Sequence, residues 1–453
     1  MVGKASISLI LIALTLPASW AIFVGKNGFY EGLSVVRVGN SLVGAVSFSE
    51  LEDDSLEEGT LLLTVDSSGG VSGSYKIDGV KLTSMLDKDG KVAILGYLAE
   101  SEGRRGILLT WNPGDDRVRG LIIRNSSVTH SMAEVGGETV LVGSVEISGI
   151  WSPLILRMRG GEVEKAFTIP GSIEAYDSTV KGDSIALAGF SYSPPGMTII
   201  LLRGSSIVWS EEIRLKGARL EPNSISFGSS SDEIAVAGTA WMGSPKRSDG
   251  FIAILDGDGT LLDFLLVGGQ GGNQFYEVKW DPFEREFVAV GMGGCFIEGG
   301  CDALMVRVAP EGDHVTGMRL GTTKVEKAES ILPLKSSYII AGTSEGEVTR
   351  SLFYGMFMRI SRDGKGCLPK REFDLAVRHE KPELEDLKVT LKEINLITEA
   401  ENLKVERARS LEIWNPCSLD PYFLRGIAVL IFVVAVIFVA MALLSKKFIT
   451  QRE

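Results

Sequence analysis

Apolar and polar residues follow one another along this chain in a unit that repeats. An apolar run with a glycine is followed by a polar loop, a second apolar run and a turn rich in Asp and Gly. Such runs between turn residues predict antiparallel β-hairpins, because Gly and Asp tolerate the positive φ of tight turns. The first run recurs as SLVGAVSF, KVAILGYL, TVLVGSVEI, SIALAGFSY, EIAVAGTAW, FVAVGMGG and YIIAGTSE, with its glycine at Gly44, Gly96, Gly143, Gly189, Gly238, Gly291 and Gly342.

The second run recurs as well, so each repeat supplies four strands. Its copies are TLLLTVD, GILLTWN, PLILRM, MTIILLR, FIAILDG, ALMVRV and GMFMRI. Four antiparallel strands in about 40 to 50 residues are the unit of a β-propeller. The sequence therefore predicts an all-β chain with a seven-bladed β-propeller over residues 22–377. A β-sandwich would not explain seven copies of one pattern.

The two ends of the predicted ring can be matched. Residues 22–31 (IFVGKNGFYE) resemble residues 265–277 (LLVGGQGGNQFYE), where one blade passes into the next. The N-terminal strand, residues 22–27, is thus expected to complete blade seven and to join the ends of the ring.

The repeats resemble those of seven-bladed β-propeller proteins of the exported microbial cell-surface type. Residues 249–269 (DGFIAILDGDGTLLDFLLVGG) and 301–321 (CDALMVRVAPEGDHVTGMRLG) carry this resemblance most clearly, and it covers about residues 22–370. It implies a fold and an exported location but no ligand, since propellers host many functions. Trp280-Asp281 stands in a first strand, so the WD-repeat class is not indicated.

Two hydrophobic segments predict the location. Residues 1–21 have the charged, apolar and small-residue order of a signal peptide, with cleavage expected after Ala21; an uncleaved anchor is the alternative. Residues 424–445 predict a transmembrane helix, because 426–444 contain no charge; a buried core helix is the alternative. The basic tail, residues 446–453, is expected in the cytoplasm and the propeller outside, in a single-pass cell-membrane protein.

Charge limits the partners. The chain carries −12 overall, and residues 22–445 carry −15 once the single positive charge before them and the +2 of the tail are set aside. Nucleic acid is therefore not an expected partner, because phosphate binding needs clustered Lys and Arg. We expect contact with the membrane through one helix and with a protein or glycan at the cell surface.

Four cysteines in an exported chain predict two disulfides. Cys295 and Cys301 bracket a short hairpin loop, which brings strand ends within disulfide reach. Cys367 and Cys417 then remain to pair with each other. A zinc site is the alternative, but the spacing does not favour it, and no metal site is assigned.

Residues 378–420 break the repeat and predict a charged, β-rich stalk between propeller and membrane. LKVTLKEINLI and NLKVERA alternate with strand period. A helix is the alternative, because Leu384, Leu387, Leu391 and Ile394 also fit one helical face.

No catalytic motif is present, and Asp256–Gly259 fits a hairpin turn better than a calcium loop. The most suggestive residues start the first strand of each repeat, which should line the channel. Aligned by pattern, they are Glu31, Thr83, His130, Ala175, Ser224, Glu277 and Glu329. Glu31, His130, Glu277 and Glu329 are candidates for a site at the channel mouth that holds a cation or a basic group; a solvated polar rim is the alternative. No other cofactor is expected. Asn125 begins a glycosylation sequon.

The sequence favours a membrane-anchored binding, display or scaffold module over an enzyme, and no catalytic residue is assigned. The alternative is an exported propeller enzyme that uses the channel mouth, either a quinoprotein-like oxidoreductase or a glycan-active hydrolase. A hydrolase would need two of the three glutamates about 5 to 9 Å apart. A structural role in a surface lattice or a larger membrane complex is a third hypothesis.

Overall fold

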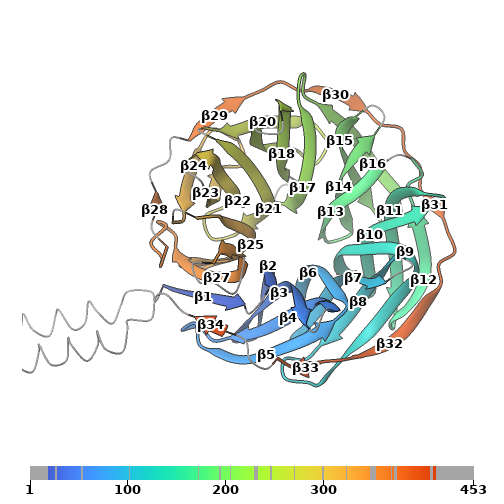
Figure 1. Cartoon of the computed structure of the whole chain (residues 1–453). Coiled ribbons are helices and arrows are strands. Elements are labelled where there is room, and N and C mark those ends of the chain that lie inside the picture. The colour runs from blue at the N-terminus through green and yellow to red at the C-terminus, as the bar shows by residue number, and fades with distance from the viewer. Residues whose placement is uncertain are drawn as a thin grey trace, which may run out of the picture. The chain divides into compact units, whose positions relative to one another are not determined.

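Figure 1 shows the computed structural model of the chain. It describes residues 19–414 apart from residues 26–27, 53–54, 101–102, 172, 193–194, 205, 229–232, 245–246, 270, 298–299, 323, 347–352, 369, 372–374 and 409–411. Every regular element in this part is a β-strand, and it contains no helix long and apolar enough to cross a membrane. Most of the expected signal peptide, the expected helix 424–445, the tail 446–453 and Cys417 lie outside the described residues.

The building block is a meander of four strands in which each strand pairs antiparallel with the next, and the meanders stand in a ring (Figure 1). The chain is therefore a β-propeller. The first meander is β2–β5 and the second is β6–β8 with the first half of the long strand β9, whose second half opens the third meander with β10–β12. The bounds are β2 Gly28–Val38, β3 Ser41–Glu52, β4 Ser55–Val65, β5 Val71–Asp78, β6 Val80–Lys88, β7 Lys91–Glu100, β8 Gly103–Trp111, β9 Arg117–Val135, β10 Glu138–Ile147, β11 Ile150–Arg159 and β12 Glu162–Thr168.

The later meanders are β13–β16, β17–β20 and β21–β24, followed by β25–β27 with the N-terminal strand β1. Their bounds are β13 Ile173–Lys181, β14 Ser184–Tyr192, β15 Pro195–Arg203, β16 Ser206–Arg214, β17 Arg219–Phe227, β18 Ile234–Ser244, β19 Arg247–Leu255, β20 Leu261–Gly268, β21 Gly272–Asp281, β22 Glu286–Ile297, β23 Gly300–Val308, β24 Val315–Leu320, β25 Glu326–Leu334, β26 Ser337–Glu345, β27 Phe353–Ser361 and β1 Trp20–Gly25.

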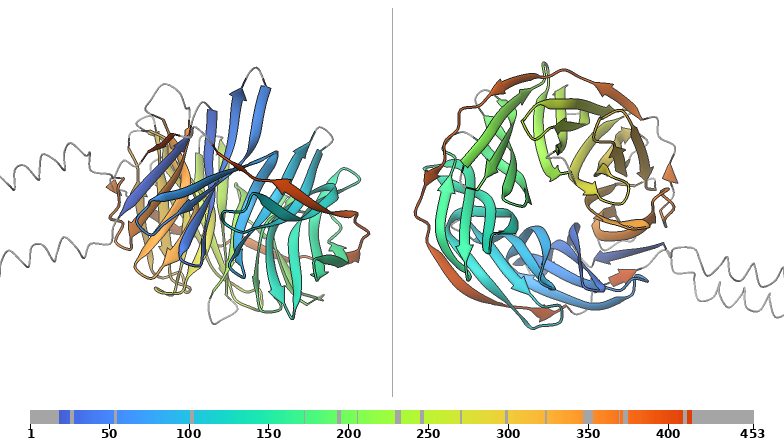
Figure 2. Two further views of the ribbon diagram at one scale, coloured as in Figure 1. Left: turned by 90° about the horizontal axis from the view of Figure 1, so that it is seen from below. Right: turned by 180° about the vertical axis from the view of Figure 1, so that it is seen from behind.

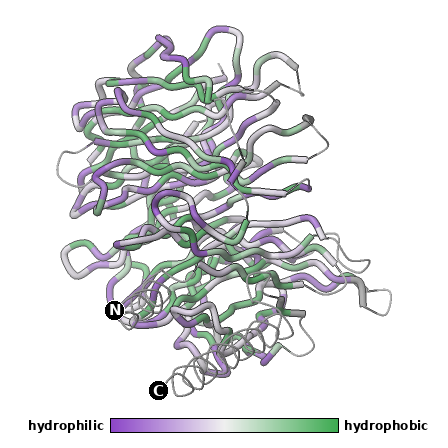
Figure 3. Tube along the Cα trace, turned by 90° about the vertical axis from the view of Figure 1, so that its left-hand side faces the viewer, coloured by the Kyte–Doolittle hydropathy of each residue, from purple (hydrophilic) through white to green (hydrophobic). Residues whose placement is uncertain are grey.

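The hydrophobic core is divided into clusters between neighbouring meanders. One cluster, for example, joins Ala237 and Ile252 of one meander to Phe275 and Ala289 of the next. The second and third strands of a meander are therefore buried on both faces, which explains why their sequences are continuous apolar runs rather than alternating ones. Figure 3 shows apolar residues concentrated along the strands and polar ones at the turns.

The first strand of each meander carries a β-bulge, an extra residue with no partner on the second strand. In β13, for instance, Ala175 faces Gly189 and Asp177 faces Ala188, so Tyr176 is the extra residue. The equivalent extra residues are Leu33, Thr83, His130, Tyr176, Asn223, Tyr276 and Glu329.

This bulge explains the repeated glycine. A Cβ added at Gly96, Gly143 or Gly238 would lie 2.1 Å from a carbonyl oxygen of the bulged strand, so no side chain fits there. The first meander departs from the rule, because Val46 holds the corresponding position and Gly32 lies opposite it. Gly44 is therefore not equivalent to the other repeat glycines.

Strand β1 closes the ring by pairing antiparallel with β27, with Trp20 opposite Arg359. It begins two residues before the strand predicted at 22–27. Trp20 is buried, and its indole Nε1 donates to the carbonyl oxygen of Ser67 in the first meander at 3.2 Å. The cleavage expected after Ala21 would fall inside this strand.

Residues 370–414, hereafter the belt, encircle the outside of the ring (Figures 1 and 2). The belt strands are β28 Lys370–Arg371, β29 Ala376–His379, β30 Glu383–Asp386, β31 Lys392–Glu393, β32 Thr398–Lys404, β33 Glu406–Arg407 and β34 Glu412–Trp414. They pair antiparallel with the outermost strands β24, β20, β16, β12, β9, β5 and β1, in that order. The belt therefore runs round the ring in the direction opposite to that of the meanders.

The belt corrects the prediction of a separate stalk over 378–420 as far as residue 414. An outer strand has one edge of unpaired N–H and C=O groups, and a short extended segment satisfies them. The four apolar residues that also fitted one helical face lie in the belt instead. Leu387 and Leu391 pack on one core cluster and Ile394 on the next, whereas Leu384 remains exposed.

Candidate functional site

The extra residue of every bulge lines one cavity of about 300 Å³ at the centre of the ring. A bulge re-aims its side chain toward the space beside the strand, and here the repeated bulges converge on the axis. The residues that follow them, among them Asp177, Ser224 and Glu277, line the same space. We call it the central cavity.

The structure brings together some of the sequence-predicted residues. Thr83, His130, Ser224, Glu277 and Glu329 line the central cavity. Two of the seven aligned positions do not contribute to this lining. Ala175 is buried beside the bulge, and Glu31 lines a neighbouring pocket. By strand register the equivalents are Leu33 and Tyr176, because the unpaired residue is defined by pairing with the second strand, and alignment by similar letters placed Glu31 two residues and Ala175 one residue too early.

Glu329 shares a lysine with Glu31. Lys327 Nζ lies 3.0 Å from Glu329 Oε1 and forms a second ion pair with Glu31. Burial raises the pKa of Glu329, and the charge of Glu31 and a hydrogen bond with it add to this effect. Burial alone would lower the pKa of Lys327, but the two glutamates outweigh it and raise the pKa.

A second charged group joins Glu277, Lys279 and Asp177. Lys279 Nζ is 3.2 Å from Glu277 Oε1, and the charge of Glu277 is the main cause that raises the pKa of Lys279. Glu277 Oε2 also accepts the backbone N–H of Ile331 in the next meander at 2.5 Å. This carboxylate therefore holds two meanders together as well as facing the cavity.

Asp177 is the counterpart of Glu277 two meanders earlier. It accepts hydrogen bonds from the Ser224 hydroxyl at 2.9 Å and from the backbone N–H of Ile225 at 3.0 Å. Burial raises its pKa to about 6, although Lys279 and these bonds favour the charged form. Asp177 and Glu277 therefore both link neighbouring meanders.

His130 and two tyrosines complete the polar lining. Burial lowers the pKa of His130 to about 4, so its imidazole is neutral at pH 7, and its Nε2 lies 3.4 Å from Ser144 Oγ. Burial also raises the pKa of Tyr176 to about 12 and the pKa of Tyr276 further. The hydroxyls therefore remain protonated and can donate hydrogen bonds.

Sequence reasoning missed the lysines, although a sign of them was present. Lys279 follows Glu277 by two residues and Lys327 precedes Glu329 by two, so each pair lies on one face of its strand. Glu277 and Glu329 form ion pairs with Lys279 and Lys327, so these carboxylates do not form a purely negative site for a cation. In the part of the chain that the structure describes, no three His, Cys, Asp or Glu side chains gather closely enough to hold a metal ion.

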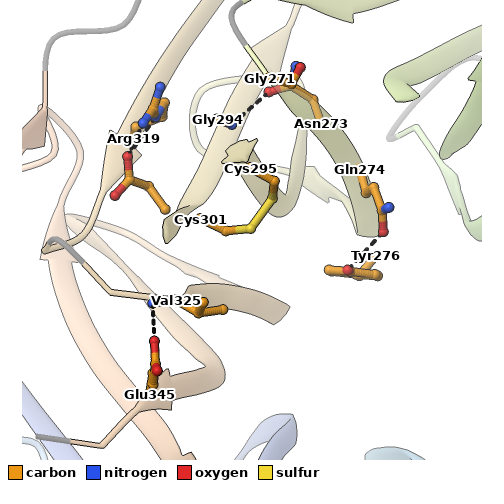
Figure 4. The surroundings of a disulfide bond; sticks show 11 residues. Gly271, Asn273, Gln274, Tyr276, Gly294, Cys295, Cys301, Arg319, Val325 and Glu345 are labelled. Atoms are coloured by element: carbon orange, nitrogen blue, oxygen red, sulfur yellow. Dashed lines mark hydrogen bonds and ion pairs between the residues drawn. A yellow bond between two sulfur atoms is a disulfide. The ribbon is translucent and has the colours of Figure 1, made fainter. Parts of the chain in front are cut away.

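The remaining predicted residues lie away from the centre. Cys295 and Cys301 form the predicted disulfide, with their Cα atoms 4.3 Å apart, beside Val325 of the next meander (Figure 4). Cys367 is also disulfide-bonded, and its expected partner Cys417 lies outside the described residues. Asn125 lies under the belt, where its side-chain oxygen accepts the backbone N–H of Ile397 at 3.3 Å.

Comparison with known proteins adds little to this picture. No protein-family model and no curated protein matches the chain. Among solved structures, the β-propeller domain of the trilobed protease from Pyrococcus furiosus is similar at 12% identity and a TM-score of 0.44, over 74% of this chain and 93% of that one. The acylaminoacyl peptidase of Pyrococcus horikoshii is similar at 12% identity and a TM-score of 0.43, over 72% of this chain. This chain spans about half the length of that peptidase, 51%. Similarity at this level concerns the arrangement of strands and carries no information about ligand or reaction.

Proposed function

We propose that this chain is a membrane-anchored extracellular binding and display module built on a closed, seven-bladed propeller. Each four-strand meander would be one blade, with β1 completing the last. A signal peptide would export the chain, and the apolar segment 424–445 would anchor it, with the tail 446–453 in the cytoplasm. We place cleavage ahead of Trp20 rather than after Ala21, because Trp20 and Ala21 are buried in β1.

The observation that carries the proposal is the way the cavity carboxylates are engaged. Glu277 and Asp177 each accept a backbone N–H of the next blade, and Glu329 forms an ion pair with Lys327 of its own strand. Carboxylates that are already bonded to other parts of the protein can present a fixed polar surface. They are poorly suited to proton transfer in a reaction. Around them the belt holds the blades, which keeps the surface rigid. The partner would be a protein or a glycan of the cell surface, and a cation at the cavity mouth would be an accessory at most.

The alternative, an exported hydrolase, has one observation in its favour. The pKa of Glu329 and the pKa of Asp177 are both raised, as in general acids. Glu329 and Glu31, however, both form ion pairs with the same lysine, Lys327, so neither carboxyl group is free to act as acid or nucleophile. This favours binding over hydrolysis at this pair. No feature of the cavity favours a quinoprotein.

The test compares the full chain in detergent micelles with its Glu277→Gln/Glu329→Gln double variant. Both would be applied to arrays of surface glycans and peptides and to chromogenic glycosides. We expect saturable binding that the double variant weakens at least tenfold, with no turnover. The exposed variant Glu162→Gln should behave as the wild type. Unchanged binding would remove the central cavity from the proposal, and turnover that requires Glu329 would replace it with the hydrolase.

A further inference from the structure

A second pocket, of about 340 Å³, lies where the first and last meanders meet. It is lined from β2, β3, β6, β25, β26 and β27, and β2 and β27 lie side by side at this junction (Figure 1). Glu31 and Lys327 line this pocket, whereas Glu329, which binds the same lysine, lines the central cavity. The pocket therefore adjoins the cavity but has its own walls.

One wall is a stacked pair of aromatic rings. Phe29 and Phe353 stack with their centroids 5.4 Å apart, and Phe29 is 51% exposed. Beneath them the rings of Tyr30 and Phe48 are buried. A flat apolar surface of this kind is suited to a ligand with a flat apolar face of its own.

The opposite wall contains a buried hydroxyl with no partner. Thr343 is 2% exposed, and its Oγ1 makes no hydrogen bond in the described structure. Buried polar groups are nearly always satisfied, and leaving one unsatisfied costs free energy. Because Thr343 also lines the pocket, a small movement of its side chain would let a bound ligand supply the missing partner.

The other polar groups decide the class of ligand. Glu31 and Lys327 form an ion pair with each other, and Lys81 Nζ lies 2.9 Å from Glu58 Oε1, so the charges at the pocket are balanced. This balance disfavours both a cationic and an anionic ligand. A neutral ring with several hydroxyls can donate to the carboxylate, accept from the ammonium groups and pair with Thr343 at the same time.

We propose that this pocket binds one pyranose residue of a neutral glycan, stacked on Phe29 and Phe353 and hydrogen-bonded to Thr343, Glu31 and Lys327. The proposal rests on the proposed binding function and names its ligand class. It adds a sugar contact at the junction of the first and last meanders to the contact proposed at the central cavity.

The experiment titrates methyl glycosides of glucose, galactose, mannose and N-acetylglucosamine into the full chain in micelles, with binding followed by saturation-transfer NMR. Phe29→Ala should weaken binding at least tenfold because it removes the stacking surface. Thr343→Val should weaken it about fivefold, the effect of one neutral hydrogen bond. Its unfolding midpoint should be unchanged or higher, because the variant removes an unsatisfied buried hydroxyl.

The chain offers matched controls for both variants. Phe283→Ala removes a ring that is 50% exposed, and Thr198→Val removes another buried hydroxyl without a partner; neither residue lines the pocket. Both should bind as the wild type does. Binding that survives Phe29→Ala and Thr343→Val but disappears with Glu277→Gln would assign the sugar to the central cavity and overturn the pocket, while the proposed function stands. Binding of surface proteins but of none of the glycosides would overturn the ligand class alone. If neither surface proteins nor glycosides bind, both the pocket and the proposed function are overturned.

Discussion

At the rim of this ring, backbone groups of the outer strands are covered by belt strands, whereas at the centre polar side chains surround a cavity of about 300 Å³. Rim contacts are mainly backbone pairing and apolar packing, as where Val405 is buried in a core cluster, with ion pairs such as that of Arg378 with Asp249 added. Central contacts join charges such as Glu277 and Lys279. The difference teaches that the rim serves stability, whereas the centre combines links between meanders with the candidate ligand chemistry, so changes at the two places should have different consequences.

The largest loss of stability is expected at the ring closure on the rim. Trp20→Ala should lower the free energy of unfolding by about 3–5 kcal/mol, because it empties a buried indole site between the last and first meanders. Denaturant titration would measure the loss. The exposed Leu56→Ala should change it by about 0.5 kcal/mol or less. A Trp20 effect as small as that of Leu56 would mean that β1 does not hold the ring closed.

A smaller and more local loss is expected within the belt. Val405 is 4% exposed, and its N–H donates to the carbonyl oxygen of Asp116 at 2.9 Å. Val405→Asp should cost about 3 kcal/mol locally by burying a charge, and should lift this part of the belt. Trypsin should then cut after Lys404 and Arg407 before the meanders unfold. The exposed Glu406→Ala is the control, and global unfolding at the same rate would show that belt and ring are one cooperative unit.

The smallest expected change is at the centre and depends on pH. The folded-state pKa of Asp177, about 6, is above its ordinary value of 3.8. The folded protein therefore binds a proton that the unfolded chain has released, and stability from this group falls as pH rises from about 4 to 6.

Asp177→Asn should remove that decline. We expect a difference of about 1–2 kcal/mol between pH 4 and pH 7, less than the full shift implies because Asp177 is only partly buried. Thermal unfolding of the variant and the wild type across this range would measure it. Identical pH profiles would show that Asp177 is not held in its neutral form.

Much of the fold could be predicted because it depends on short-range patterns. Buried second strands give apolar runs, and the repeated glycine reports the close approach of a bulged strand. The hairpin disulfide Cys295–Cys301 followed from the short distance along the chain between the two cysteines, six positions. The candidate site was less predictable, because the unpaired residue of each bulge is fixed by pairing with the second strand, which letter alignment does not show. Glu31 was therefore aligned with the cavity, while Tyr176, Tyr276 and the two lysines were missed.

The sequence by itself determined the repeating four-strand unit, its all-β character and the hairpin disulfide, because alternation, turn residues and steric limits act between neighbours in the chain. Only the tertiary structure decided that the belt, residues 370–414, includes most of the predicted stalk, since an open strand edge exists only after the meanders have formed. It also decided which carboxylates face lysines, and it placed the unpartnered Thr343 hydroxyl in a pocket between the first and last meanders. Those positions depend on residues up to about three hundred places apart, whose proximity arises only when the ring closes.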